Sequence, residues 1–216
     1  MLYPFLNKTL LPLLLRRVKN LEGLENLPEN RPFIFCVNHL GYLEGIFIKA
    51  VMIRHAHRNV YFITKEIYWR FFKKIIGKKA TEEWLGMIPR LNVEPAGSLA
   101  VAGEYLKKGA IIGIFPEGTR NFDPQFLLKG KTGAARLALR ARVPVVPMGY
   151  YGPVTRRKRQ GVVKFFRSKE KIKIIIGQPI YFDKYYDNEI TKQLLDELTR
   201  KIMVEIGKLC DKTYPY

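Results

Sequence analysis

The chain has 216 residues, of which 47% are hydrophobic, so it can bury a core of its own and is not a disordered tail. Its 38 Lys and Arg against 19 Asp and Glu give a net charge of +19. This charge fits a phosphate-bearing partner, either nucleic acid or an anionic membrane, or a generally basic proteome in which much of the excess is solvated lysine. Its two cysteines, Cys36 and Cys210, are too few for a disulfide framework, so a reducing, intracellular setting is the default expectation.

The N-terminal segment, residues 1–20, combines a short apolar run, Leu10–Leu15, with cations that follow it. These cations are Arg16, Arg17 and Lys19. The run is shorter than the about 20 apolar residues that cross a bilayer, and the cations stand on the wrong side for a secretory signal peptide. The pattern fits a helix in the lipid interface or a helix packed on its own domain. We divide the chain into a membrane-interfacial segment, 1–20, and a globular domain, 21–216.

Short apolar runs alternate with longer helical patterns through the rest of the chain. We predict strands at 32–38, 59–64, 87–92, 110–115, 143–152, 162–166 and 171–177. We predict helices at 45–53, 66–76, 95–109, 133–141 and 188–210, the last capped by Asp187 or Asn188. This alternation indicates an α/β fold, a single domain with a mixed, largely parallel central sheet flanked by helices.

The predicted helix 66–76, "EIYWRFFKKII", is apolar, aromatic and basic at once. It fits an amphipathic helix that touches lipid, or a helix that faces the core and exposes its lysines. For a single segment of this length we favour the second interpretation.

A strongly basic stretch at 156–173 offers a nucleic-acid interpretation, with Phe165 and Phe166 as stacking platforms. No sequence signature of a known nucleic-acid-binding module accompanies it. Because the same cations suit an anionic lipid surface or an acidic carrier protein, we expect no nucleic acid as partner.

Two polar constellations follow predicted strands, where parallel sheets place their sites. His39 and Glu44 are five positions apart; the imidazole can accept a proton and the carboxylate can orient the ring. Alone, the pair also fits a loop His beside an unrelated surface acid. The stretch 116–121, "PEGTRN", places an acid, a hydroxyl and a guanidinium within four positions, and Arg suits phosphate. A further pair, His55 and His57, lacks a clustered acid or thiol, so we expect surface residues and no metal.

The order of these stretches resembles the glycerolipid acyltransferase family, the family of the lysophosphatidate acyltransferases, over residues 21–182. "NHLGYLE" is similar to the family's Asn-His-x4-Asp block, and "MIPRLN" to its second block, centred on Arg90. "IFPEGTRN" is similar to the third block and "VPVVPMG", with Pro147, to the fourth. Lys65, in "ITKE", stands where the family has a basic residue near its phosphate site.

The resemblance implies acyl transfer without an acyl-enzyme. The sequence agrees with this mechanism, since it contains no G-x-S-x-G motif that would position a nucleophilic serine. His39 would act as general base on a lysophospholipid hydroxyl, oriented by Glu44, and the alkoxide would attack acyl-CoA or acyl carrier protein. The implied substrate-binding residues are Lys65, Arg90, Glu117, Gly118, Thr119 and Arg120. Glu117 would either organise Arg120 or assist in the acceptor site. The resemblance implies no metal and no cofactor beyond the acyl donor, and a place on the cytoplasmic face of an anionic membrane.

One position departs from the phospholipid branch of the family, where Asp is the commoner acid at the place of Glu44. The additional methylene changes the reach of the carboxylate but not its charge. Relatives that acylate lipid A precursors carry Glu at this place, so the resemblance keeps acyl transfer and leaves the acceptor lipid open.

Overall fold

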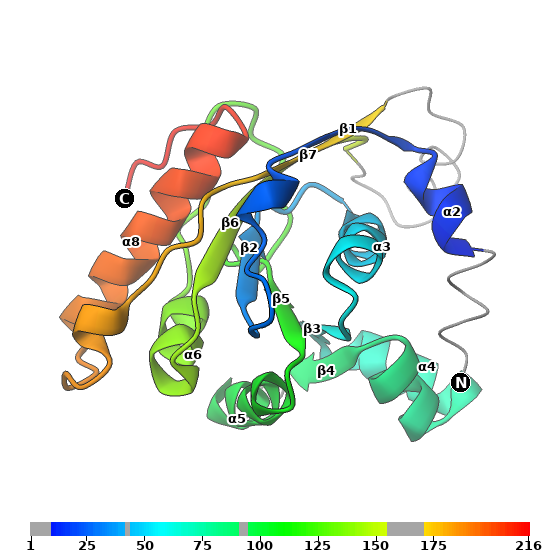
Figure 1. Cartoon of the computed structure of the whole chain (residues 1–216), viewed down its shortest axis with the longest axis horizontal. Helices are drawn as coiled ribbons and strands as arrows, with labels where there is room; N and C mark the ends of the chain where they lie inside the picture. Colours follow the sequence, from blue (N-terminus) through cyan, green and yellow to red (C-terminus); the bar gives the residue numbers. More distant parts are fainter. Residues whose placement is uncertain (1–9, 42–43, 91–94, 155–170) are drawn as a thin grey trace.

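The centre of the fold is a seven-stranded sheet of order β1-β7-β6-β2-β5-β3-β4 (Figure 1). The computed structural model describes residues 10–41, 44–90, 95–154 and 171–216. The strands are β1 (Val18–Glu22), β2 (Ile34–Val37), β3 (Val60–Lys65), β4 (Met87–Arg90), β5 (Ile111–Ile114), β6 (Val145–Tyr151) and β7 (Ile172–Ile176). The strands from β6 to β4 run parallel, whereas β7 is antiparallel to β6 and β1 is parallel to β7. The predicted fold, one α/β domain with a mixed, largely parallel sheet, is confirmed.

Helices cover both faces of the sheet, with α5, α6 and α8 on one face and α2 and α3 on the other (Figure 1). The helices are α2 (Leu10–Leu15), α3 (Glu44–Ala56), α4 (Glu66–Ile76), α5 (Pro95–Lys107), α6 (Gly133–Ala141) and α8 (Lys192–Leu209). Short helical turns are η1 (Leu24–Asn26), η2 (Ala80–Trp84) and η3 (Asp183–Tyr185). The helix α4 lies at the edge of the sheet, against β3, β4 and η2.

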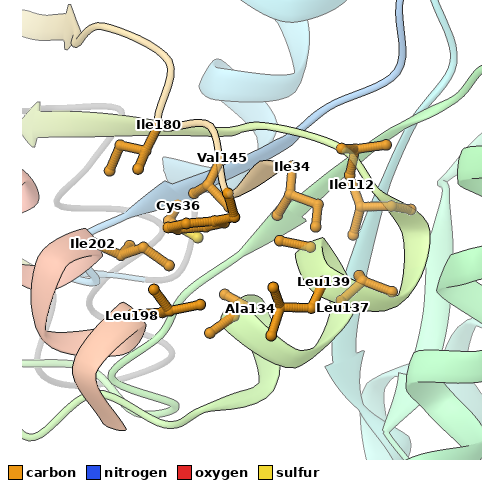
Figure 2. Close-up of a cluster of buried hydrophobic side chains, with 14 of the residues drawn as sticks. Ile34, Cys36, Ile112, Ala134, Leu137, Leu139, Val145, Ile180, Leu198 and Ile202 are labelled. Carbon is orange, nitrogen blue, oxygen red and sulfur yellow. The ribbon is translucent and has the colours of Figure 1, made fainter. Parts of the chain in front are cut away.

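The core divides at the sheet because successive side chains of a strand point to opposite faces. In β2, Ile34 and Cys36 face α6 and α8, whereas Phe35 and Val37 belong to the cluster under α3. Figure 2 shows the first cluster, in which Ile34 and Cys36 meet Ala134, Leu137, Leu198 and Ile202. Cys36 is fully buried in this cluster, and burial raises the pKa of its thiol well above the ordinary value, so this thiol is an inert core residue.

Two local predictions are wrong. The last helix begins at Lys192, capped by the side chain of Thr191, whose hydroxyl accepts from the N–H of Leu194, and not by Asp187 or Asn188. The favoured interpretation of α4 as a helix that faces the core is wrong in extent: of its apolar side chains only Tyr68, Trp69 and Phe72 are half-buried, and none of its 11 residues, all described, is buried. It lies at the edge strand β4, where the domain can cover only one side of it.

The N-terminal segment enters the fold directly. Leu14 and Leu15 of α2 pack against the cluster under α3, while Leu13 is 59% exposed. The strand β1, which the sequence analysis did not predict, spans the boundary between residues 20 and 21 and pairs with β7. Among the described residues, no helix has the length and apolar character to cross a membrane. The predicted strand at 162–166 and most of the basic stretch lie outside the described residues.

Candidate active site

The strand order brings the predicted site residues together at the carboxyl ends of the central strands. The strands β2, β5, β3 and β4 are parallel neighbours, so their carboxyl ends lie together. His39 and Glu117 follow β2 and β5, which are adjacent, while Lys65 and Arg90 end β3 and β4. Lys65 and Arg90 are paired in register. Parallel sheets bind ligands at this edge, so the chain assembles here what its sequence spreads over about 80 positions.

His39 and Glu44 form a hydrogen-bonded pair, in which Nδ1 of the imidazole faces Oε1 of the carboxylate. Glu44 is the first residue of α3 and is 2% exposed, whereas the His39 side chain is 23% exposed. A helix N-terminus favours a carboxylate. Since Nδ1 is engaged by the acid, the proton-accepting atom of a neutral His39 ring is Nε2.

Opposing effects act on the pKa of Glu44. Burial raises the pKa of this carboxyl, and it is the largest influence. The hydrogen bond and charge of His39 lower it, as do the backbone N–H groups of Gly41 and Leu40. The main group that stabilises a carboxylate at this buried position is therefore the imidazole, above all in its protonated form.

The stretch 116–121 fixes the backbone of His39 through the side chain of Glu117 and the N–H of Asn121. The main-chain N–H of His39 donates to Oε1 of Glu117 at 3.1 Å, and the N–H of Leu128 donates to Oε2 at 2.9 Å. The carbonyl of His39 accepts from the N–H of Asn121 at 2.6 Å. Glu117 is buried, at 3% exposure, so neither carboxylate oxygen faces open solvent. Its observed contacts fix backbone, a use that differs from both roles considered from the sequence.

Two residues that the sequence analysis left without a role complete the frame around His39. The ring of Phe115 stacks on the imidazole, with centroids 4.2 Å apart and planes 22° apart. The buried amide of Asn38 exchanges two hydrogen bonds with the backbone of Tyr150 on β6, at 2.7 and 3.0 Å. Asn38 directly precedes His39 and Phe115 lies two positions before Glu117, each at the end of an apolar run, and this position was the available signal.

The turn that follows β5 depends on Gly118. Its N–H donates to the carbonyl of Phe115 at 2.9 Å, and its φ of +68° lies in the left-handed region that glycine tolerates best. A Cβ at this position would lie 2.8 Å from Cε and 2.9 Å from Nζ of Lys131. The N–H of Lys131 also donates to the carbonyl of Pro116. The structure thus adds to this turn a cation that the sequence analysis missed.

The remaining predicted residues lie around this turn and at the neighbouring strand ends. Thr119 and Lys65 are exposed, and the guanidinium of Arg120 lies over the ring of Phe122 at 5.4 Å. The backbone of Arg90 ends β4, and its side chain lies outside the described part of the structure.

No metal centre is found in the described ranges, since they contain no group of three or more His, Cys, Asp or Glu side chains that could hold an ion. His55 and His57 are both exposed near the end of α3. The prediction that these two histidines are surface residues is confirmed.

A His–carboxylate pair at one strand end and a buried-acid turn at the next fit the acyltransferase assignment that the sequence resemblance implies. A comparison with family models supports this assignment: the Acyltransferase family model matches residues 19–151, more than half of the chain. The chain belongs to this family, and it is an enzyme of acyl transfer.

The chain is similar to several individual acyltransferases. The chain is 30% identical over 188 residues to the 1-acyl-sn-glycerol-3-phosphate acyltransferase of Bacillus subtilis, which covers 87% of this chain and 86% of that protein. It is 27% identical over 154 residues to the human 1-acyl-sn-glycerol-3-phosphate acyltransferase alpha, covering 66% of this chain and 51% of that protein. The crystal structure of the 1-acyl-sn-glycerophosphate acyltransferase PlsC of Thermotoga maritima shares the fold, with a TM-score of 0.60 and 21% identity over 94% of this chain and 80% of that one.

Proposed function

We propose that the enzyme transfers a fatty acyl group from a thioester to the free hydroxyl of 1-acyl-glycerol-3-phosphate, giving phosphatidate. The observation that carries this proposal is the hydrogen-bonded pair of His39 and Glu44 beside the buried carboxylate of Glu117. The relatives named for this acceptor support the choice of acceptor. The thioester is that of acyl-CoA or acyl carrier protein, and the reaction uses no metal and no further cofactor.

In the proposed mechanism, His39 removes the proton from the acceptor hydroxyl as the oxygen attacks the thioester carbonyl. Glu44 holds the ring in one tautomer and stabilises the imidazolium that forms. The tetrahedral intermediate expels the thiolate, which takes the proton from His39. The carbon–sulfur bond is replaced by a carbon–oxygen bond, and the enzyme returns to its starting state.

The proposed acceptor phosphate lies among the cations at the strand ends. Lys65 and Arg90 end neighbouring strands in register, and Arg120 belongs to the turn after β5. Guanidinium groups offer paired donors that match phosphate oxygens. Gly118 and Thr119 line the same turn, and the carboxylate of Glu117 keeps that turn attached to the backbone of His39.

We place the reaction at the cytoplasmic face of an anionic membrane. The net charge of +19 supports this placement, since each Lys or Arg near an anionic leaflet contributes about 1 kcal/mol. The segment 1–20 adds an apolar anchor in this proposal, and the two free, buried thiols fit a reducing compartment.

The test is a direct assay of the purified full chain with a radiolabelled thioester and vesicles that contain lysophosphatidate. We expect labelled phosphatidate with at least one of two donors, acyl-CoA and acyl carrier protein, run side by side. A protein that labels no lysophosphatidate with either donor contradicts the proposal.

A second candidate acceptor is favoured by Glu44, which replaces the Asp commoner in the phospholipid branch. The same assay therefore includes a lipid A-type acyl-sugar acceptor beside lysophosphatidate. Labelling of the sugar acceptor alone would assign this chain to that acceptor.

A further inference from the structure

The helix α4 presents an apolar row to solvent. Ile67, Phe71 and Ile75 are spaced four residues apart, which places them on one side of a helix. Their exposed fractions are 70%, 58% and 60%, and none of the 11 residues of α4 is buried. A row of large apolar side chains this exposed marks a contact surface when it is continuous.

The row is part of an apolar arc that the domain covers only on one side. Tyr68, Trp69 and Phe72, which continue the arc around the helix, are half-buried. The arc is therefore wider than the surface that β3, β4 and η2 offer to it. The helix has one apolar side for the domain and one that the described residues leave open.

Cations stand beside the open side. The helix carries Arg70 and Lys74, and Lys78 and Lys79 follow it, all of them exposed. Arg70 pairs with Glu66 at 3.7 Å, and a further exposed cation of the helix, Lys73, lies over the ring of Trp69 at 4.9 Å. Glu66 is the one acid in the helix sequence. A second copy of the chain docked on this face would bring these like charges together, which is unfavourable. An apolar row flanked by exposed cations complements the interface of an anionic bilayer, in which apolar side chains enter the acyl region and cations meet headgroups.

The position of α4 ties this surface to the site. The helix begins at Glu66, directly after Lys65, which ends β3 and is one of the proposed phosphate ligands. A membrane that touches α4 therefore lies close to the strand end at which the acceptor headgroup is proposed to bind.

We propose that α4 is the membrane-docking helix of this enzyme, lying in the interface of an anionic leaflet with Ile67, Phe71 and Ile75 inserted. The docking brings the carboxyl ends of β3 and β4 to the lipid surface, so that the acceptor keeps its acyl chain in the bilayer while its headgroup reaches the site. The contribution of α4 to catalysis rests on the proposed function, whereas the binding of α4 to vesicles is tested without any assay of activity.

The binding test uses the full chain and sedimentation with vesicles of phosphatidylglycerol and phosphatidylcholine, or of phosphatidylcholine alone. We expect Phe71→Asp to weaken binding to the anionic vesicles at least ten-fold. The matched control is Val101→Asp on α5, which places the same charge at an apolar residue of 45% exposure, and it should bind as the unchanged protein does. Anionic binding by Phe71→Asp equal to that of the unchanged protein overturns the proposal.

Charge reversal tests the second component. We expect Lys74→Glu with Lys78→Glu to lower binding to anionic vesicles by ten-fold or more, while Lys192→Glu with Lys201→Glu, exposed on α8, has a clearly smaller effect. Equal losses in the two double variants would mean that only overall charge matters, and would overturn the assignment to α4.

An assay with a short-chain, water-soluble lysophosphatidate and a soluble thioester separates docking from chemistry. Phe71→Asp should keep its rate on this acceptor and lose at least ten-fold on vesicle-borne acceptor. If the unchanged protein is inactive on both acceptors while Phe71 governs vesicle binding, docking stands and the proposed function fails. If Phe71→Asp instead converts a dimer to a monomer in sedimentation velocity, the face belongs to a second copy and the docking proposal is overturned.

Discussion

The main-chain N–H of His39 donates to the Oε1 of Glu117, a carboxylate that follows the neighbouring strand 78 residues later. The same carboxylate accepts the N–H of Leu128 through Oε2. Glu117 thus joins the loop after β2 to the segment after β5, and the position of the proposed base depends on a buried acid that need not touch substrate.

Glu117→Gln should lower both stability and turnover. An amide has one acceptor oxygen, so one of the two backbone donors would face an NH₂ group and stay unpaired. We expect the free energy of unfolding to fall by about 1–3 kcal/mol, measured by urea denaturation. Glu104→Gln, at an exposed ion pair with Lys107, is the control and should change it by less than about 1 kcal/mol. Unchanged stability and turnover in Glu117→Gln would contradict the anchoring role.

His39→Ala should lower kcat by about 10²–10⁴-fold, because the acceptor hydroxyl loses its proton acceptor. The measurement is acyl transfer to lysophosphatidate with the fold checked by circular dichroism. Since His39 is partly exposed, the variant should remain folded. Full activity in a folded His39→Ala protein would exclude the proposed mechanism.

Glu44→Gln should separate stability from activity. Burial raises the pKa of Glu44, so the folded state holds a proton on this group more readily than the unfolded chain does. Its contribution to stability is therefore full below the unfolded pKa and is lost as the pH rises through the folded pKa. The midpoint of thermal unfolding of Glu44→Gln, measured relative to that of the unchanged protein, should therefore be higher at pH 8 than at pH 4. At the same time kcat should fall, because the imidazolium loses its carboxylate.

Glu44→Asp tests the length of the side chain at the same position. If the site is built around Glu44, the shorter acid no longer reaches Nδ1 of His39 without a shift of α3, and activity on every acceptor falls. A rise in activity on lysophosphatidate would instead show that the longer acid is unfavourable for this acceptor. Both results are read from kcat/KM on the acceptors of the assay above.

Gly118→Ala should impair the turn after β5. The added Cβ would meet Lys131 at 2.8 Å, and the φ of +68° is unfavourable for alanine. We expect a loss of stability of about 1 kcal/mol or more and a higher KM for the phosphorylated acceptor. Gly77→Ala, at a φ of +84° with no atom within 4 Å, is the control for backbone strain alone and should leave KM unchanged.

Lys49 predicts a pH dependence of stability. Its ammonium donates to the carbonyl of Leu85, and burial lowers the pKa of Lys49 to about 7. Between pH 7 and about 10 the unfolded chain binds the proton that the folded protein has lost, so stability at this group rises with pH. The difference in unfolding free energy between the unchanged protein and Lys49→Met should therefore shift toward the unchanged protein from pH 7 to pH 9. A difference that stays constant over this range would contradict the shift.

The central strands and helices could be predicted from the sequence because their apolar patterns are continuous. The helix Gly133–Ala141 begins and ends where its pattern does. The edge strand Val18–Glu22 could not, since "VKNLE" has no long apolar run and is half-exposed. Its place is decided by pairing with β7, a contact between distant residues.

The site shows the same division. The sequence indicated that His39 and Glu44 lie close together, because the acid follows the histidine by five positions at a strand end. It could not indicate the contacts of Glu117, because its partners are backbone N–H groups of residues outside its own turn. Almost every residue carries such a group, so the sequence does not reveal which one becomes the donor. For α4 the sequence offered two interpretations and we favoured the helix that faces the core, since periodicity shows an apolar arc but not how much of it a domain covers.

The contacts of His39 with Glu44 and with Glu117 differ in the order in which a folding chain can make them. The contact with Glu44 closes a loop of five residues, whereas the contact with Glu117 spans 78 and requires β2 and β5 to be paired. Closing short loops precedes closing long ones. The imidazole and its acid can therefore meet early, whereas the backbone of His39 is held in place only once β2 and β5 have paired. Competence for catalysis therefore requires this long-range pairing and not the pair alone.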